Sequence, residues 1–354
     1  MAKTIMIMAG GTGGHIFPGL AVADYLKGQG WKVVWLGGPN SMEAELIPKH
    51  GYEIALVEFS GVRGKSLWRR MMSPLALLVA LGQAVVAFLR FRPKVVLGMG
   101  GYITVPGGLV AFLLRRPLVI HEQNAIAGLS NKLLAVLAKR VMSGFPDVVL
   151  PKPEWCGNPV RENIAALSDP QLRYGERSGP LNLMVVGGSL GAKVINERIP
   201  QALALIPENE RPHVLHQSGK RHYEATREAY RAAGVEAAVM PFVDNMAFYY
   251  AQADLIVCRS GALTVSELAA AGIASILVPF PHAVDDHQTV NARFLSERGA
   301  AILLPQKEFT PEKIAELLRG ITRERALEMA QAARAVAQPD AARRVAEVCM
   351  EVAA

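Results

Sequence analysis

A glycine-rich loop near the start of the chain constrains the possible fold most strongly. Residues 5–9 form a short apolar run that predicts a buried strand, and Gly10-Gly11-Thr12-Gly13-Gly14 follows it directly. Pro18 is expected in the first turn of the next helix, a favoured position for proline. Glycine lets the backbone approach an anion closely, and the first N–H groups of a helix are available to bind it. The loop therefore predicts a phosphate-binding turn between a strand and a helix.

The same design returns at residues 183–192, about halfway along the 354-residue chain. Both halves alternate short apolar runs with helical stretches, a pattern typical of parallel βαβ units. We therefore expect an α/β protein with two Rossmann-like parallel-sheet domains. The further predicted strands lie near residues 32–36, 53–59, 95–98, 118–121, 181–186, 213–216, 237–240, 254–258, 275–278 and 300–303.

The domain boundaries are predicted from turn-forming residues. Residues 142–161 are rich in glycine and proline, which indicates the end of the first domain and a linker. We expect a first domain over residues 1–160 and a second over residues 161–340. Pro339-Asp340 interrupts a long helical region. A last helix within 341–354 is expected to pack back on the first domain.

The composition favours anionic small molecules or lipids as partners. The formal net charge is +7, and aromatic residues make up only 6% of the chain. The sequence shows none of the motifs of the common nucleic-acid modules, so we expect no nucleic-acid partner. Its three cysteines are far apart and lack metal-like spacing, which indicates free thiols in a reducing cytoplasm.

Residues 74–89 form an apolar stretch with arginines beyond both ends. Its sixteen residues, interrupted by Gly82-Gln83, are short of the ~20 that a membrane-spanning helix needs. An internal crossover helix and a helix lying in the membrane interface both remain open. Because residues 109–116 end in two arginines and have the same character, we favour membrane-surface contact by the first domain. Leu77, Leu81 and Phe88 are the expected lipid-facing side chains.

Two nucleotide-binding motifs are incomplete in this chain. The dinucleotide fingerprint needs a third glycine where Ile16 stands, and an acidic residue at the end of the second strand, where Gly37-Gly38 stands. A dehydrogenase is therefore disfavoured. Gly64-Lys65-Ser66 resembles the end of a P-loop but lacks the upstream glycine, so we interpret it as a basic loop.

Residues 257–272 carry the most informative pattern of the second half. A buried strand ends at Arg259-Ser260-Gly261, and an amphipathic helix is expected to follow. Its first N–H groups and the Thr264 hydroxyl could bind a diphosphate. Glu267 could bind a ribose diol, or it could simply stabilise the helix dipole by ~0.3–1 kcal/mol. The residues alone leave both roles open.

Six motifs occur in order along the whole chain, at residues 9–15, 98–102, 121–124, 157–161, 187–189 and 258–267. Together they resemble the family-28 glycosyltransferases of peptidoglycan synthesis. The resemblance implies a GT-B fold, with two Rossmann-like domains facing across a cleft. It also implies an inverting transfer of N-acetylglucosamine from UDP-N-acetylglucosamine to lipid I, undecaprenyl-diphospho-MurNAc-pentapeptide. The product would be lipid II, made by a peripheral protein at the anionic cytoplasmic face of the cell membrane.

The resemblance also implies roles for individual residues. The second domain would bind the donor, with the Val243 backbone at uracil and Glu267 at the ribose. Ser189 and the turn of Ala262, Leu263, Thr264, Val265 and Ser266 would hold the diphosphate. Gln288 and Asn124 would contact the sugar, Arg161 would lie beside the nucleotide, and Thr12, Gly13 and Gly14 would close on the sugar and the acceptor diphosphate. His287 and Leu190 depart from the family pattern, which expects glutamine at both positions.

Inverting transfer needs a base for the acceptor hydroxyl and a positive environment for the departing UDP. Histidine, with an ordinary pKa near ~6.5, suits the first task. His15 is the candidate base or acceptor-positioning residue, and Glu122 is its competitor. Since no Asp-x-Asp pair is present, we expect no cofactor and no metal, with helix N-termini and Arg161 balancing the diphosphate charge.

Two other functions remain open at this point. A UDP-sugar epimerase of the same architecture would bind the donor but would need no acceptor. A non-catalytic module that binds a nucleotide-sugar or a lipid carrier would need neither a base nor turnover.

Overall fold

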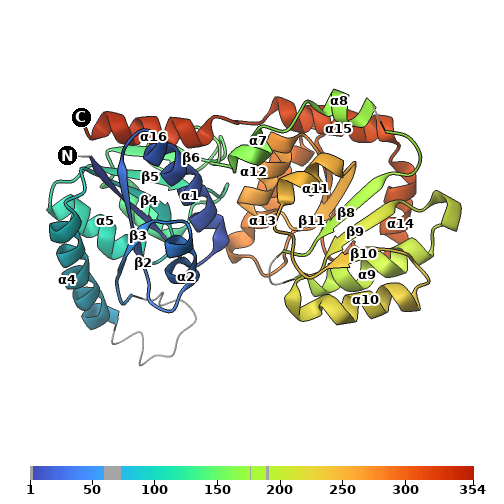
Figure 1. Cartoon of the computed structure of the whole chain (residues 1–354), viewed down its shortest axis with the longest axis horizontal. Coiled ribbons are helices and arrows are strands. Elements are labelled where there is room, and N and C mark those ends of the chain that lie inside the picture. Colours follow the sequence, from blue (N-terminus) through green and yellow to red (C-terminus); the bar gives the residue numbers. More distant parts are fainter. Residues whose placement is uncertain (1–2, 60–72, 176, 189–190) are drawn as a thin grey trace. The chain divides into compact units, whose positions relative to one another are not determined.

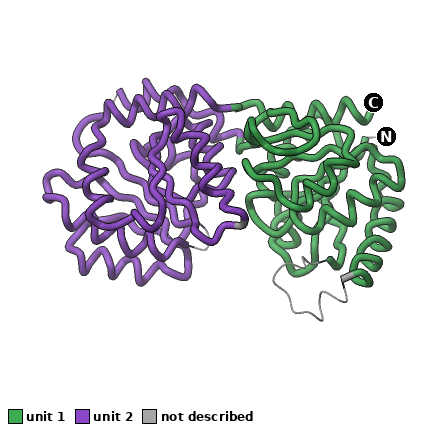
Figure 2. The backbone as a smooth tube through the Cα atoms, turned by 180° about the vertical axis from the view of Figure 1, so that it is seen from behind, with its two compact units in different colours: residues 1–161, 338–354 green, residues 162–337 purple. Residues whose placement is uncertain are grey.

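The computed structural model describes residues 3–59, 73–175, 177–188 and 191–354. Ser189, Leu190 and Gly64-Lys65-Ser66, which the sequence singled out, lie outside these ranges. The chain divides into two compact units (Figure 2). Unit 1 comprises residues 1–161 and 338–354, and unit 2 comprises residues 162–337.

Unit 1 is built on a parallel sheet (Figure 1), and its described strands follow the order β3-β2-β1-β4-β5-β6-β7. Alternate residues of the central strand point to opposite faces, with Ile5 and Ile7 in one apolar core and Met6 and Met8 in the other. The strands are β1 (Thr4–Ala9), β2 (Lys32–Gly37), β3 (Glu53–Leu56), β4 (Val95–Gly100), β5 (Leu118–Glu122), β6 (Arg140–Ser143) and β7 (Pro153–Trp155).

Helices cover both faces of this sheet. On the face of Ile5 and Ile7 lie α1 (Gly13–Gly28), α2 (Met42–Lys49) and α16 (Ala341–Val352). Val345 and Cys349 of α16 are fully buried in this core, so the C-terminal helix belongs to unit 1. The other face carries α4 (Ser73–Phe91), α5 (Thr104–Leu113) and α6 (Leu129–Ala135).

Two local expectations for unit 1 are wrong. Helix α1 begins at Gly13, inside the glycine loop, so Pro18 is its sixth residue rather than part of its first turn. The missing N–H of Pro18 deprives only the Gly14 carbonyl of its helical donor. Residues 142–161 are also more than a linker. They supply the end of β6 and all of β7 to the sheet, so this stretch is part of the unit 1 fold.

Helix α4 also differs from its prediction. It has 19 residues and is long and apolar enough to cross a membrane by length and composition, although only sixteen apolar residues had been expected. Only 22% of its 18-residue apolar window is buried. Ala80, Ala84 and Phe88 pack in the core, and the exposed leucines lie on other sides. Phe88 is therefore a core residue rather than a lipid-facing one, and α4 is not an internal helix.

Unit 2 repeats the architecture with the strand order β10-β9-β8-β11-β12-β13, again parallel in its described residues. The strands are β8 (Asn182–Val186), β9 (His213–Gln217), β10 (Ala238–Met240), β11 (Leu255–Cys258), β12 (Ala274–Leu277) and β13 (Ala301–Leu303). The helices are α7 (Glu162–Ala165), α8 (Pro170–Gly175), α9 (Lys193–Ala204), α10 (Tyr223–Ala232), α11 (Met246–Gln252), α12 (Ala262–Ala271), α13 (His287–Ser296), α14 (Pro311–Gly320) and α15 (Arg323–Ala335).

The strand orders locate the binding regions. In each sheet the order reverses beside the first strand of the unit, between β1 and β4 and between β8 and β11. Doubly wound sheets bind ligands outside the carboxyl ends of the strands at such a switch point. Both glycine loops of the sequence lie there, directly after β1 and β8. The prediction of two Rossmann-like α/β domains is confirmed.

Candidate functional site

In unit 1, two glycine turns pack against each other at the switch point. Gly10 follows β1, and Gly101 follows β4 with φ +89°. A Cβ on Gly101 would lie 2.3 Å from the Gly10 carbonyl oxygen, so only glycine fits there. Gly11 also has φ +89°. The glycines therefore set the backbone path beside the ends of β1 and β4.

A buried carboxylate that the sequence analysis did not single out holds this loop. Glu43 of α2 is fully buried and accepts hydrogen bonds from Gly11 N at 3.2 Å and Gly38 N at 3.1 Å. No acidic residue ends β2 in the sequence, but the fold brings Glu43 to that point. Its oxygens bind the amides of the protein itself, where a dinucleotide enzyme would offer an acid to a ribose. Burial and the charge of Glu43 both raise the pKa of Tyr102 beside the loop.

The start of α1 carries three of the predicted acceptor residues. Thr12 is the extended N-cap, and Gly13 and Gly14 are the first two helical residues. Amides at this position have no acceptor within their own helix and point out of its end. Gly13 has an ordinary φ, but a Cβ there would lie 3.0 Å from the Phe17 ring. A side chain added at Gly13 would therefore crowd a side chain of its own helix.

Glu122, at the end of β5, organises the turn that follows it. It is 1% exposed, and its oxygens accept hydrogen bonds from Asn124 N, Gly128 N and Asn131 Nδ2, each at 2.9 Å. The Asn124 side-chain amide also donates to it at 3.4 Å. Both carboxylate oxygens thus bind amides of the same turn, which favours a role in shaping that turn over proton transfer.

His121 lies directly before Glu122 and is fully buried. Its Nε2 is 2.9 Å from the Gly157 carbonyl oxygen, and its Nδ1 is 3.0 Å from Gln123 Nε2. Burial lowers the pKa of His121 to about 4, so the ring is neutral at pH 7. A neutral ring that donates through Nε2 must accept through Nδ1.

His15, the third residue of α1, meets this group from the other side. Its Nδ1 lies 2.7 Å from Gln123 Oε1, and the ring is partly exposed. The fold thus joins the glycine loop to the motif at 121–124 through Gln123. The sequence predicts roles only for Glu122 and Asn124 of this motif, and the structure adds Gln123. Arg161, also predicted, is the last residue of the first segment of unit 1.

In unit 2, the loop after β8 packs on the end of β9. Gly187 N donates to Gln217 O at 2.9 Å. Gly191 has φ +77°, and a Cβ there would lie 2.5 Å from Ser218 O. This loop also needs glycine for a close backbone approach. Ser189, the predicted diphosphate contact, lies between these two glycines but outside the described residues.

The predicted diphosphate turn begins a helix as expected. Gly261 is the N-cap of α12, and residues 262–264 form its first turn. The preceding Arg259 donates to Val278 O, Pro279 O and Gln306 Oε1 at 3.1, 3.0 and 2.7 Å. These contacts join the loops after β11, β12 and β13, and burial lowers the pKa of Arg259. Arg259 is therefore a structural cation beside the turn.

Gln288 of α13 is tied to the same turn. Ser260 Oγ donates to its backbone carbonyl at 2.8 Å, and its side-chain Oε1 accepts from Phe280 N at 2.9 Å. The side-chain oxygen is thus engaged, so a contact to sugar hydroxyls would come from the amide nitrogen. The neighbouring His287 is the first residue of α13.

Glu267 is the sixth residue of α12 and only 4% exposed. Helix-dipole stabilisation falls off within the first turn of a helix. The position of Glu267 therefore disfavours the dipole role that the sequence left open. Val243, the predicted uracil contact, is also 4% exposed, which fits recognition through its backbone.

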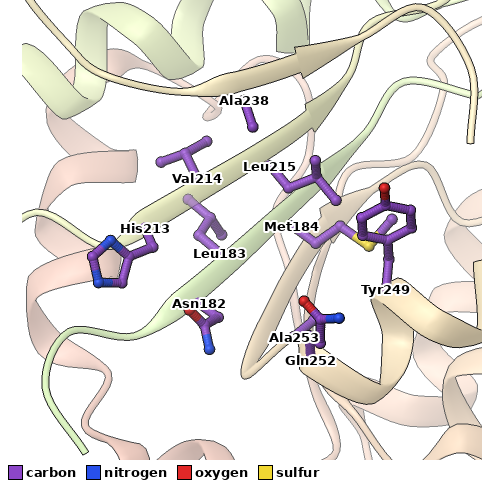
Figure 3. A pocket seen from close by; sticks show the side chains of 10 residues that line it. All are labelled: Asn182, Leu183, Met184, His213, Val214, Leu215, Ala238, Tyr249, Gln252 and Ala253. Atoms are coloured by element: carbon purple, nitrogen blue, oxygen red, sulfur yellow. The ribbon is translucent and has the colours of Figure 1, made fainter.

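A separate pocket in unit 2 lies away from these loops (Figure 3). It has a volume of about 270 Å³ and is lined by apolar strand residues together with Tyr249 and Gln252 of α11. Asn182 and His213 at its rim are the first residues of β8 and β9. The pocket is thus at the amino ends of the strands, opposite the switch point. Across the described ranges, no group of three or more His, Cys, Asp or Glu residues could hold a metal ion.

Comparison with known proteins gives consistent matches over the chain. The glycosyltransferase family 28 N-terminal domain matches residues 5–143, and the C-terminal domain of the same family matches residues 182–345. A protein of Aromatoleum aromaticum is 58% identical, covering 99% of this chain and 98% of its own length. One of Dechloromonas aromatica is 56% identical over the full length of both. Each is named UDP-N-acetylglucosamine--N-acetylmuramyl-(pentapeptide) pyrophosphoryl-undecaprenol N-acetylglucosamine transferase.

Comparison with solved structures gives the same result as the comparison of sequences. The crystal structure of Acinetobacter baumannii MurG is 40% identical with a TM-score of 0.87, and 99% of each chain is covered. This match confirms the predicted GT-B class. A putative UDP-N-acetylglucosamine 2-epimerase from Listeria monocytogenes has a TM-score of 0.62, covering 98% of this chain and 95% of its own. At 16% identity, that likeness concerns the fold alone.

Proposed function

Since the chain belongs to glycosyltransferase family 28, we propose that it transfers N-acetylglucosamine from UDP-N-acetylglucosamine to lipid I and so forms lipid II. Relatives with this activity in their names match it at 55–58% identity over nearly the whole chain. The geometric observation that carries the proposal is the position of His15. It places a partly exposed imidazole beside the glycine turn at the switch point of unit 1.

Unit 2 binds the donor in this proposal. The N-terminal residues of α12, 262–266, and Ser189 hold the diphosphate, since helix N-termini bind anions. Glu267 accepts hydrogen bonds from the ribose hydroxyls, and the Val243 backbone pairs with uracil. The amide nitrogen of Gln288 donates to the sugar, because its oxygen is bound to Phe280 N.

Unit 1 binds the acceptor. Thr12, Gly13 and Gly14 contact its diphosphate, while Asn124 contacts the donor sugar and Arg161 lies beside the nucleotide. His15 takes the proton from the acceptor hydroxyl as that oxygen attacks the anomeric carbon of the donor. The bond from this carbon to the UDP oxygen breaks in the same displacement, so the configuration inverts. Helix dipoles stabilise the charge on departing UDP.

His15 is preferred to Glu122 as the base because of their contacts. The oxygens of Glu122 bind amides of the turn after β5. Among the described residues, His15 has a hydrogen-bond partner at Nδ1 only, which leaves Nε2 for the substrate. A general base must come within hydrogen-bond reach of the proton that it removes, and a partly exposed ring can do so.

A lipid-facing surface on unit 1 supports a peripheral location at the cytoplasmic face of the membrane. We define this surface by exposed apolar side chains on α4, α5 and α6 and just beyond the ends of α5 and α6. Helix α5 packs against both α4 and α6, so the three helices that carry these side chains are neighbours. Arg90, Arg115 and Lys132 can bind anionic headgroups around it. Its members are Leu75, Leu78, Val79, Val86, Leu89, Phe112, Leu113, Leu114, Leu129, Leu133 and Val136.

One experiment separates this function from its alternatives. The protein is incubated with labelled UDP-N-acetylglucosamine, with and without a short-chain lipid I analogue. Label in the lipid product, formed only when the acceptor is present, supports the transferase. A changed sugar on UDP without acceptor would indicate an epimerase, and binding without turnover would indicate a non-catalytic module.

A further inference from the structure

We propose that Gln123 is a positioning residue that fixes the tautomer of His15, with the proton on Nδ1 and the lone pair on Nε2. The inference deepens the proposed function and rests on it only for the consequence in turnover. Hydrogen bonds connect Gly157, His121, Gln123 and His15 in turn. Backbone carbonyl oxygens, which can only accept, fix the direction of these bonds.

The direction of the Gln123 amide is set by a backbone carbonyl. Gln123 Nε2 lies 3.0 Å from the His121 carbonyl oxygen, which can only accept a hydrogen bond. The Gln123 side chain is 1% exposed, so a flipped amide would place two oxygens together without water to separate them. The nitrogen therefore faces β5, and Oε1 faces His15.

The hydrogen bonds of His121 independently support the same orientation of the Gln123 amide. Its Nε2 donates to the Gly157 carbonyl oxygen, so its neutral ring accepts at Nδ1. The second hydrogen of Gln123 Nε2 satisfies that acceptor at 3.0 Å. Both amide hydrogens of Gln123 are then donated to His121, and the amide oxygen is left to accept from His15.

The consequence concerns His15. Gln123 Oε1 can only accept, so His15 Nδ1, at 2.7 Å, must carry a proton. In a neutral imidazole the other nitrogen is then an acceptor. Nε2 thus holds the lone pair that a base needs. Gly100 leaves room for the ring in this position, because a Cβ there would lie 2.9 Å from His15 Cε1.

The test compares two variants of Gln123 in the full-length protein. Gln123→Met keeps the length of the side chain but offers no hydrogen bond. Gln123→Glu in its protonated form restores an oxygen acceptor for His15 Nδ1, while its O–H donates to His121. Ring-¹⁵N-labelled histidine reports the tautomer by NMR without any substrate, and the His15 signals are identified by their loss in His15→Gln. Turnover is measured separately with UDP-N-acetylglucosamine and a soluble lipid I analogue.

We expect protonated Nδ1 and unprotonated Nε2 for His15 in the parent protein and in Gln123→Glu. Gln123→Met should show a mixture of tautomers. Its kcat should fall about tenfold, the effect of losing one ordinary hydrogen bond, while UDP affinity stays the same. Gln123→Glu should recover part of this loss. Gln83→Met is the matched control. Gln83 lies on α4, and its Oε1 accepts a hydrogen bond from Glu58 N at 2.7 Å, so this variant also removes one glutamine hydrogen bond.

Two outcomes would overturn the proposal. One is that neutral His15 in the parent protein carries its proton on Nε2. This measurement uses the parent protein alone and does not depend on the folding of a variant. The other is a Gln123→Met protein that loses turnover while its His15 tautomer is unchanged, because Gln123 would then support the structure only. A parent protein with the expected tautomer but no transfer would contradict the proposed function and leave the tautomer assignment standing.

Discussion

The side-chain oxygen of Gln123 lies 2.7 Å from Nδ1 of His15, across 108 positions of sequence. This contact joins the first helix of unit 1 to the end of its fifth strand, on the side where the glycine loop turns. It gives the imidazole a fixed orientation before any substrate binds. Preorganised groups of this kind lower the barrier because they need no rearrangement during the reaction.

Removing the imidazole should separate binding from chemistry. His15→Ala should bind UDP with nearly the parent affinity, because the proposed nucleotide contacts belong to unit 2. Its turnover should fall by ~10²–10⁴ if His15 takes the proton. Calorimetry with UDP and steady-state kinetics measure the two effects. A loss of only a few fold would make His15 an acceptor-positioning residue and return Glu122 to consideration as base.

Glu267 should determine the affinity for the donor ribose and the discrimination against a 2′-deoxyribose donor. Glu267→Ala should raise the donor KM about tenfold or more, since a charge-assisted hydrogen bond contributes ~1.5–3 kcal/mol. The parent protein should discriminate against a 2′-deoxyribose donor, and the variant should not. The comparison of the two donors is the essential measurement. An unchanged KM in a folded variant would leave Glu267 without a donor role.

The lipid-facing surface should control membrane binding independently of catalysis. Replacing Leu78, Val86 and Leu89 by serine should release the protein from anionic vesicles in a sedimentation assay, with soluble-acceptor activity intact. These side chains are 62–65% exposed, so their loss should leave the core undisturbed. Leu172→Ser and Leu205→Ser, at exposed leucines of unit 2, serve as controls. Unchanged sedimentation of the triple variant would contradict the proposed location.

Acid should destabilise the protein through its buried histidines. Burial lowers the pKa of His121 to about 4 and that of His216 to about 3, from 6.5. Between the folded and unfolded pKa values the unfolded chain binds more protons, so stability is lost as pH falls below about 6.5. For His121 the full loss, reached near pH 4, is on the order of 3 kcal/mol.

Urea unfolding at pH 7, 6 and 5 measures this dependence. His216→Gln should weaken it, because that variant lacks one of the two groups. His213→Gln should leave it unchanged, since His213 is exposed on the same strand. Equal pH dependence in the parent and His216→Gln proteins would show that other groups cause the acid sensitivity.

The sequence predicts the architecture well because periodicity and glycine are local signals. Apolar runs such as residues 5–9 and 95–98 form the expected central strands, and the glycine turns follow β1 and β8. Strand β7 was missed because its three residues, Pro153–Trp155, carry no apolar pattern. The start of α1 was misplaced because glycine is a weak helix former, so the prediction began the helix at the proline.

The site is less predictable because its contacts join distant residues. His15 and Glu122 were identified from their motifs, yet their different roles became visible only from their partners. Glu43 carries no motif, and its importance depends on burial beneath the glycine loop. Gln123 was hidden for a related reason, since nothing local in the sequence shows that its oxygen meets a helix 108 residues away.

The central claim is tested most directly by following one sugar from donor to acceptor. An excess of the protein is mixed with a short-chain lipid I analogue and with UDP-N-acetylglucosamine labelled at the anomeric carbon. An inverting transferase should release one equivalent of UDP for each lipid II analogue formed, with inverted configuration at the labelled carbon. Retention of configuration, or consumption of the donor without a glycosylated lipid, would contradict it.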